Sequence, residues 1–301
     1  TIESMLRRFD IVHFHALGPS LLSGLPRLSG SRTVVTVHGL DWQREKWGRV
    51  ASWFLRQCEG PAAKFPNRTI VVSKTLREYF ASEHKCKTVF IPNGTTLPKP
   101  RPAKKILQLG LEPGKYILFV GRLVPEKGVM DLVEALPGLP DNVVVRFVGD
   151  GVLRAQIERR AGELELTDRV ELHTAVPSTS IPTVLQQLDA LALPSHTTAN
   201  WKEQFGRILI EAMSCGVPVI GAASGEIPNV IGDAGLIVPE RNSAALRSAI
   251  SRLLYDGALR HELRQRGRAR VLAHYTQAAL ARRYYAIYDT MLNSPVSYSL
   301  S

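Results

Sequence analysis

The stretch YILFVGRLVPEKGVMDLVEAL, residues 116–136, contains a strand, a loop and a helix in succession, and it decides the fold class. Its first five residues are all apolar or aromatic, which is typical of a strand buried on both faces of a parallel sheet. Gly121 ends this strand, and helical spacing of apolar residues begins near Val129. A strand that leads directly into a helix is the unit from which parallel α/β sheets are built.

The same alternation runs through most of the chain. Short β-branched runs are separated by segments with helical spacing, which predicts an α/β protein with parallel sheets. Helical spacing is clearest in 44–65, in 74–84 and from 243 to the end. The predicted strands are 10–16, 32–39, 68–73, 87–94, 116–121, 143–149, 169–176, 190–195, 217–222 and 235–239.

The alternation falls into two series. Between them lies TTLPKPRPAKKILQLGLEPGK, residues 95–115, whose Pro and Lys content indicates a linker or surface crossover. The length of 301 residues also favours two domains over one. Ligands of parallel sheets bind at the carboxyl ends of the strands, so we expect a site in a cleft between two such units.

Composition describes an ordinary globular protein, with 45% hydrophobic and 22% charged residues. The chain contains no apolar run of about 18 residues, so the sequence predicts no transmembrane helix. Its first residues, TIESMLRRFDIVHFHA, lack the apolar core of a signal peptide. The three cysteines, Cys58, Cys86 and Cys215, form no metal-binding spacing and no even disulfide framework, which favours a reducing compartment.

The positive charge lies in the first third of the chain. Residues 1–105 hold 18 Lys and Arg against 7 Asp and Glu, which equals the net charge of +11 of the whole sequence. Such asymmetry indicates an anionic partner, namely a membrane surface, a phosphorylated acceptor or nucleic acid, or else a merely soluble basic surface. No zinc finger or basic motif interleaved with aromatic residues supports nucleic acid.

The loop after the strand 116–121 carries two cations, Arg122 and Lys127, before the helix begins. Basic side chains in a strand-to-helix loop suit an anion such as a diphosphate, and Gly121 and Gly128 permit a close backbone approach. Two basic residues in a loop are also commonly only solvated, and the loop alone leaves that alternative open.

A second polar loop, LPSHTTANWKEQFG at 193–206, follows the strand 190–195. We expect the next helix to start around Phe205 and to end at Gly216, with backbone N–H groups of Phe205, Gly206 and Arg207 facing the ligand. Two acids flank this helix start. Glu203 precedes it and Glu211 lies about two turns inside, where they suit sugar and ribose hydroxyls; either acid alone is as well explained by a structural role.

These motifs together resemble the retaining family 4 glycosyltransferases. FVGRLVPEKGVMDLVEAL (119–136) is similar to that family's donor diphosphate loop, and EQFGRILIEAMSCGVPVI (203–220) to its motif of two acids separated by seven residues. GEIPNVIGDAGLIVP (225–239) resembles the segment that follows, with Asn229 where the family usually has an acid. VVSKTLREYF and VFIPNG resemble the end of its N-terminal domain. The order and spacing of these motifs match those of the family from about residue 9 to 290.

The resemblance implies the GT-B fold, in which two Rossmann-like domains with parallel sheets face a cleft. It implies a partial N-terminal domain at 1–105, a nucleotide-sugar domain at 106–275, and a helical segment at 276–301 that crosses back. Family members have a strand and a glycine-rich loop before the region of FDIVHFHA, so we interpret the chain as N-terminally truncated, with an incomplete first domain.

The resemblance also implies roles for individual residues. Arg122 and Lys127 would stabilise the diphosphate leaving group in place of a metal, Glu203 would hold the transferred sugar and Glu211 the ribose. Val176, Gly121 and the backbone of Phe205, Gly206 and Arg207 would complete the donor site. His38, in VTVHGLDW, matches the family's N-domain histidine near the reacting centre, or is otherwise a structural histidine at a strand end. His13 and His15 are interpreted as strand residues.

The predicted activity is transfer of a sugar from a nucleotide-diphosphate sugar to a glycan or lipid-linked acceptor, with retention of anomeric configuration and without metal or cofactor. Cytoplasmic location is expected, with peripheral contact between the basic first domain and the inner face of the plasma membrane as a hypothesis. The alternatives are a non-catalytic nucleotide-sugar binder and another GT-B enzyme, an epimerase or a phosphorylase. A dinucleotide-dependent oxidoreductase is disfavoured because GDGVLRAQ, at 149–156, lacks the third glycine of its fingerprint.

Overall fold

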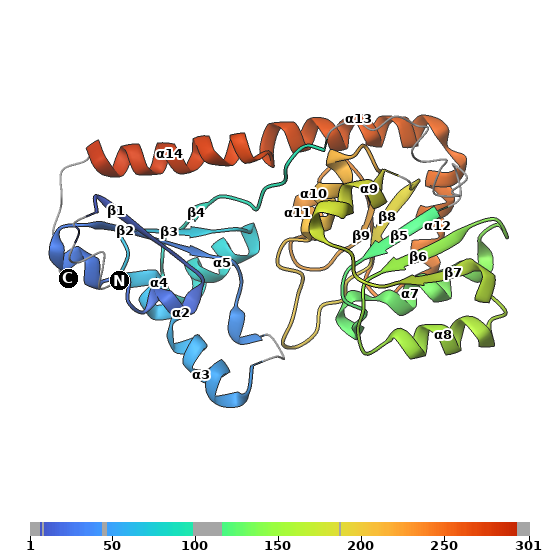
Figure 1. Ribbon diagram of the computed structural model, residues 1–301, viewed down its shortest axis with the longest axis horizontal. Coiled ribbons are helices and arrows are strands. Elements are labelled where there is room, and N and C mark those ends of the chain that lie inside the picture. Colours follow the sequence, from blue (N-terminus) through green and yellow to red (C-terminus); the bar gives the residue numbers. More distant parts are fainter. Residues whose placement is uncertain (1–6, 8, 44–46, 99–115, 187, 294–301) are drawn as a thin grey trace. The chain divides into compact units, whose positions relative to one another are not determined.

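A computed structural model describes residues 7, 9–43, 47–98, 116–186 and 188–293 (Figure 1). The chain forms two compact units. The first contains residues 1–93 together with 277–301, and the second contains 94–276. Each unit is an α/β layer structure with its own apolar core.

Within the described residues, the first unit is built on a four-stranded parallel sheet in the order β1-β2-β3-β4. Strand β2 is almost fully buried because helices cover the sheet on both faces. Val35 and Val37 pack with Phe80 on one face, whereas Val34 and Ile70 pack with α14 on the other. Figure 1 shows α14 running along the sheet. The strands are β1 (Ile11–His15), β2 (Arg32–Val37), β3 (Arg68–Val71) and β4 (Val89–Phe90), and the helices are α2 (Leu17–Ser20), α3 (Arg49–Gln57), α4 (Glu59–Lys64), α5 (Lys74–Glu83) and α14 (Gln277–Asn293).

The second unit has, in the part of the chain that the structure describes, a six-stranded parallel sheet in the order β10-β9-β8-β5-β6-β7. Its strands are β5 (Tyr116–Val120), β6 (Val144–Val148), β7 (Val170–His173), β8 (Ala190–Leu193), β9 (Val219–Ala222) and β10 (Leu236–Val238). Its helices are α7 (Val129–Ala135), α8 (Arg154–Glu163), α9 (Ile181–Leu185), α10 (Arg207–Ser214), α11 (Ile227–Ile231), α12 (Ser243–Tyr255) and α13 (Gly257–His274).

The strand order of the second sheet reverses at β5. The chain runs from β5 outward to β6 and β7, and then returns to place β8 on the other side of β5. In doubly wound sheets, ligands bind beyond the carboxyl ends of the strands at such a reversal. The loops that follow β5 and β8 therefore mark the expected position of a site in this unit.

The predicted α/β class and parallel sheets are confirmed, and each of the ten predicted strands contains a strand of the structure. The start of one helix was predicted wrongly: α10 begins at Arg207, not around Phe205, because Gly206 takes a left-handed conformation with φ of 76°. The predicted helical stretch 44–65 is two helices with Cys58 between them, and its residues 44–46 lie outside the described residues, as do 99–115 of the predicted linker. Among the described helices, none is long and apolar enough to cross a bilayer.

Candidate active site

The loops that follow neighbouring strands of the second sheet are tied to one another by backbone hydrogen bonds. Leu123, after β5, donates its N–H to the carbonyl of Asp150, after β6, at 2.9 Å. His196, after β8, donates to the carbonyl of Glu126 at 2.8 Å. Glu226, after β9, donates to the carbonyl of Glu203 at 2.9 Å. The sheet thus holds four loops together at the carboxyl ends of its strands.

Two glycines allow these loops to approach so closely. Gly128 has a φ of 65°, and a Cβ atom there would lie 1.9 Å from the carbonyl oxygen of Pro194. Gly225 has a φ of 54°, and its Cβ would lie 2.1 Å from the carbonyl oxygen of Glu203. L side chains rarely adopt this backbone conformation and would also collide with backbone atoms. Both positions therefore require glycine.

Lys127 and Glu203 meet at the centre of this group of loops. The ammonium Nζ of Lys127 lies 2.5 Å from Oε2 of Glu203, although the two residues are 76 positions apart. Ser195 donates its hydroxyl to the same carboxylate oxygen at 3.2 Å. The side chains of Lys127 and Glu203 are only 17% and 10% exposed, so their attraction is weakly screened by water. The predicted cation of one loop and the predicted acid of the other are brought together.

Arg122 lies in the same loop as Lys127 but is far more open to solvent. Its side chain is 67% exposed, and Nη2 lies 3.3 Å from Oε1 of the nearly buried Glu126. Gly121, just before it, donates its N–H to the carbonyl of Val148 at 3.1 Å, which fixes the end of β5. The loop therefore offers one held cation, Lys127, and one solvent-facing cation, Arg122.

Helix α10 presents the second predicted acid. Glu211 is half-buried, and its Oε1 lies 3.3 Å from Nη2 of Arg207, one turn earlier on the same helix. Burial raises the pKa of Glu211, while the Arg207 guanidinium acts in the opposite direction. Phe205 is buried, and its ring forms a T-shaped pair with that of Tyr275, with 5.9 Å between the ring centroids. Because α10 begins at Arg207, its terminal amide groups belong to Arg207 and Ile208, not to Phe205.

A histidine and an aspartate fasten the loop after β8 to α7. Nε2 of His196 lies 2.6 Å from Oδ2 of Asp131, in the first turn of that helix. Both side chains are largely buried. Val176, predicted as a donor-site residue, follows β7; it is half-buried against the core of the unit.

His38 belongs to the first unit and lies just after β2. Nδ1 of His15 and Nε2 of His38 are 3.1 Å apart, and their rings stack at 5.4 Å between centroids. His13 stacks on His15 in turn, with ring nitrogens 2.6 Å from the Tyr288 hydroxyl and 2.7 Å from Oγ1 of Thr36. Burial, followed by the charges of His15 and His38, lowers the pKa of His13 to about 4.

Several of these contacts were missed by the sequence reasoning. The histidine row was not recognised, although the alternation of His13 and His15 in a predicted strand places them on one face. Two residues of the loop 193–206 were not predicted as site residues either. The ring centroid of Trp201 lies 5.0 Å from Nζ of Lys127, and Ser195 donates a hydrogen bond to Glu203. Their proximity to Lys127 and Glu203 depends on the pairing of β5 with β8, for which single-sequence patterns carry no signal.

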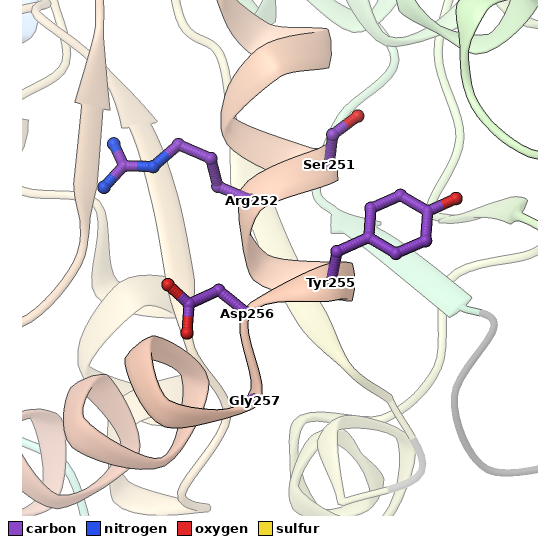
Figure 2. Close-up of a pocket in the computed structure, with 5 residues that line it drawn as sticks. All are labelled: Ser251, Arg252, Tyr255, Asp256 and Gly257. Carbon is purple, nitrogen blue, oxygen red and sulfur yellow. The ribbon is translucent and has the colours of Figure 1, made fainter.

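A separate hollow of about 510 Å³ lies where α12 meets α13 (Figure 2). Figure 2 shows the Arg252 and Tyr255 side chains pointing to opposite sides of the helix end. Asp256 caps α13 by accepting a hydrogen bond from the N–H of Leu259 at 2.8 Å. None of the predicted site residues lines this hollow. Among the described residues, no group of three or more His, Cys, Asp and Glu side chains is arranged to hold a metal ion.

Comparison with known proteins identifies the family of the chain. Residues 104–270 match the family model of glycosyl transferases group 1, and residues 1–97 match that of glycosyltransferase family 4. The D-inositol 3-phosphate glycosyltransferase of Segniliparus rotundus is 32% identical over 220 residues, which are 67% of this chain and 46% of that protein. A GDP-mannose-dependent α-(1-6)-phosphatidylinositol monomannoside mannosyltransferase of Mycolicibacterium smegmatis is 28% identical over 85% of this chain and 72% of that protein. The chain thus spans about half of the first relative and about three quarters of the second.

Solved structures show the same fold. Sucrose-phosphate synthase from Thermosynechococcus elongatus superposes with a TM-score of 0.77 at 25% identity, over 96% of this chain and 76% of that one. The Anabaena protein HepE, solved in complex with UDP, gives a TM-score of 0.81 at 20% identity, over 96% of this chain and 81% of that one. With two parallel α/β units and both family models matched in order, the chain belongs to the family 4, or group 1, glycosyltransferases of the GT-B fold.

Proposed function

We propose that this chain, within its whole protein, transfers a sugar from a nucleotide-diphosphate sugar to an acceptor, with retention of anomeric configuration and without a metal ion. The observation that carries the proposal is the pairing of Lys127 with Glu203 at 2.5 Å, on loops at the carboxyl ends of β5 and β8. A cation for a leaving phosphate and a carboxylate for sugar hydroxyls then stand beside each other. The names of the relatives, which include inositol phosphate and phosphatidylinositol mannoside transferases, support the same class of reaction.

Arg122 and Lys127 would stabilise the diphosphate as the sugar departs. Breaking the sugar–phosphate bond develops negative charge on the diphosphate and positive character on the anomeric carbon. Two side-chain cations and the positive end of α10 would balance that charge, and this supports a reaction that needs no metal. Each such donor contributes about 100-fold or more to the rate in comparable sites.

The two acids would divide the donor between them. Glu203 would accept hydrogen bonds from the hydroxyls of the transferred sugar once phosphate oxygens have replaced its carboxylate at Lys127. Glu211 would bind the ribose hydroxyls, and its partial burial strengthens any hydrogen bond that it accepts. Val176, Gly121 and the backbone of Phe205, Gly206 and Arg207 would line the rest of the donor site. His38 would take the role of the family's N-domain histidine near the reacting centre.

The acceptor is proposed to be a glycan or a lipid-linked intermediate, reached at the inner face of the plasma membrane by a cytoplasmic enzyme. Helix α3 supports this, because none of its residues, all of them described, is buried. Val50 is 81% exposed and Trp53 64%, and Phe54 and Arg56 are exposed beside them. A helix with an open apolar side and arginines, in the basic third of the chain, suits the surface of an anionic bilayer.

Calorimetric titration with UDP, GDP, dTDP and ADP tests the donor site. We expect one diphosphate to bind selectively, and Arg122→Ala and Glu211→Ala to weaken that binding. Arg122→Ala leaves the fold intact because the side chain is largely exposed. Arg159→Ala, which removes an exposed arginine of α8, is the matched control and should bind normally. Absence of binding by a chain that melts cooperatively would refute the site.

Slow hydrolysis of the matching nucleotide sugar in EDTA tests the chemistry without a known acceptor. Release of sugar with the anomeric configuration of the donor, followed by NMR, is expected for a retaining, metal-independent enzyme. Release of the opposite anomer, or dependence on added Mg²⁺, would refute retention or metal independence. Binding with no turnover, even when membrane lipid and glycan acceptors are supplied, would favour the non-catalytic binder.

A further inference from the structure

Trp201 stands next to the proposed donor site without a role. It lies two residues before Glu203, and its half-buried indole ring faces Lys127, with 5.0 Å between the ring centroid and Nζ. Lys127 therefore has two neighbours of different character: the carboxylate of Glu203 and the face of an aromatic ring.

The backbone holds Trp201 in this position. Thr198 donates its N–H to the carbonyl of Trp201 at 2.8 Å, which closes a tight turn over residues 198–201. The preceding Thr197 donates both its N–H and its hydroxyl to the carboxylate of Glu240, each at 2.6 Å. The turn is thus fastened just before the tryptophan, and Glu226 fastens the backbone just after it by its bond to the Glu203 carbonyl.

The two neighbours of Lys127 would respond differently to an arriving diphosphate. The Glu203 carboxylate neutralises the ammonium and must yield to the phosphate oxygens. The indole face attracts the ammonium through its quadrupole without cancelling its charge, and so does not compete with the phosphate. We propose that Trp201 is a positioning residue that holds the Lys127 ammonium in place while Glu203 gives way to the donor diphosphate. The inference rests on the proposed function of this site.

Two substitutions of Trp201 distinguish an interaction between its ring and Lys127 from simple packing. Phenylalanine retains an aromatic face, whereas leucine fills a similar apolar space without one. If Trp201 acts through its ring, Trp201→Phe should bind the selected diphosphate nearly as well as the unaltered chain. Trp201→Leu should lose about 3- to 30-fold in affinity. A packing role would instead make the two variants alike.

The experiment is calorimetric titration of the full chain and these two variants with the diphosphate that the unaltered chain selects, alongside their thermal melts. Tyr255→Leu, which alters a 71% exposed aromatic residue of the same unit (Figure 2), is the control and should bind normally. Fluorescence gives a second readout. The other tryptophans are Trp42, Trp47 and Trp53, so a change in emission on diphosphate binding should vanish in Trp201→Phe.

The outcomes separate this inference from the proposed function. If the unaltered chain binds no diphosphate, the donor site and the role of Trp201 both fall. If it binds and Trp201→Leu matches Trp201→Phe, the role of Trp201 alone is overturned. An emission change that persists in Trp201→Phe would also overturn it, because the change would then come from the first unit. Weaker binding by Trp201→Leu alone, with an unchanged melting temperature, supports it.

Discussion

At the scale of single residues, the candidate site contains a largely buried ion pair whose partners are proposed to have separate tasks. Lys127 and Glu203 satisfy each other, which avoids the cost of leaving either charge buried alone. In the proposed function, donor binding would exchange that pair for contacts with phosphate and sugar. The favourable free energy of diphosphate binding would then be reduced by the cost of breaking the Glu203 contact.

Replacing Glu203 with glutamine tests this exchange. Glu203→Gln keeps a side-chain oxygen for the Ser195 hydroxyl but removes the charge that holds Lys127. We expect the diphosphate alone to bind at least as tightly as before, because its phosphate no longer has to displace a carboxylate from Lys127. We expect kcat/KM for donor hydrolysis to fall roughly 10- to 150-fold, because a charged hydrogen bond to the sugar is lost. Calorimetry and rate measurements that moved together would contradict the division of tasks.

Gly128 permits a second residue-scale prediction with an internal control. In Gly128→Ala the new Cβ would meet the Pro194 carbonyl, and we expect a loss of at least about 3 kcal/mol in the free energy of unfolding. Gly216→Ala places alanine in the same left-handed region, with a φ of 72° but nothing within 4 Å, and should cost only about 1–2 kcal/mol. Denaturant titration compares them; equal losses would show that strain alone, and not loop contact, explains Gly128.

At the scale of elements, the sequence predicted the strands and helices that local residue patterns determine. All ten strands of the described residues were predicted, because apolar β-branched runs mark buried strands. The start of α10 was misplaced because the left-handed backbone conformation of Gly206 cannot be predicted from the residues around it. In the site, the identity of Arg122, Lys127, Glu203 and Glu211 came from motifs. The ion pairs between them could not be predicted from motifs. Lys127 pairs with Glu203, from the loop after an adjacent strand, and Glu211 pairs with Arg207 of its own helix.

The contact between β1, β2 and α14 predicts that the stability of the first unit depends on pH. His13 of β1 joins Thr36 of β2 to Tyr288 of α14, and its pKa of about 4 lies below the ordinary value near 6.5. The unfolded chain therefore binds more protons than the native chain between these two values. Stability is fully present above about pH 6.5 and declines as the pH falls towards 4.

We expect the free energy of unfolding of the first unit, followed in denaturant, to be lower at pH 5 than at pH 7.5. His13→Gln should make this difference smaller, because glutamine retains polar contacts but does not titrate. His261→Gln is a suitable control, since His261 lies on α13 in the second unit. An unchanged pH dependence in His13→Gln would show that other groups produce the effect.

At the scale of the whole molecule, the distribution of charge separates the two parts of the chain. The excess of Lys and Arg lies in residues 1–105, whereas the proposed donor site and its acids lie in the second unit. The first unit also carries α3, whose apolar side chains are exposed. Charge brings a protein to an anionic bilayer over a distance of about 10 Å, and apolar side chains then hold it there.

Vesicle flotation tests whether charge attracts the protein to the bilayer and the apolar side chains of α3 hold it there. With phosphatidylglycerol vesicles we expect binding that weakens as salt rises from 50 to 500 mM, and little binding to phosphatidylcholine vesicles. Val50→Ser combined with Trp53→Ser should reduce binding at every salt concentration, because the apolar contribution is lost while the basic charge is unchanged. Tyr285→Ser removes an equally exposed aromatic residue, 71% exposed, from α14 of the same unit, and should bind like the unaltered chain. Equal binding by all three proteins would refute α3 as the membrane contact, and binding that ignored lipid charge would refute the role of the basic residues in 1–105.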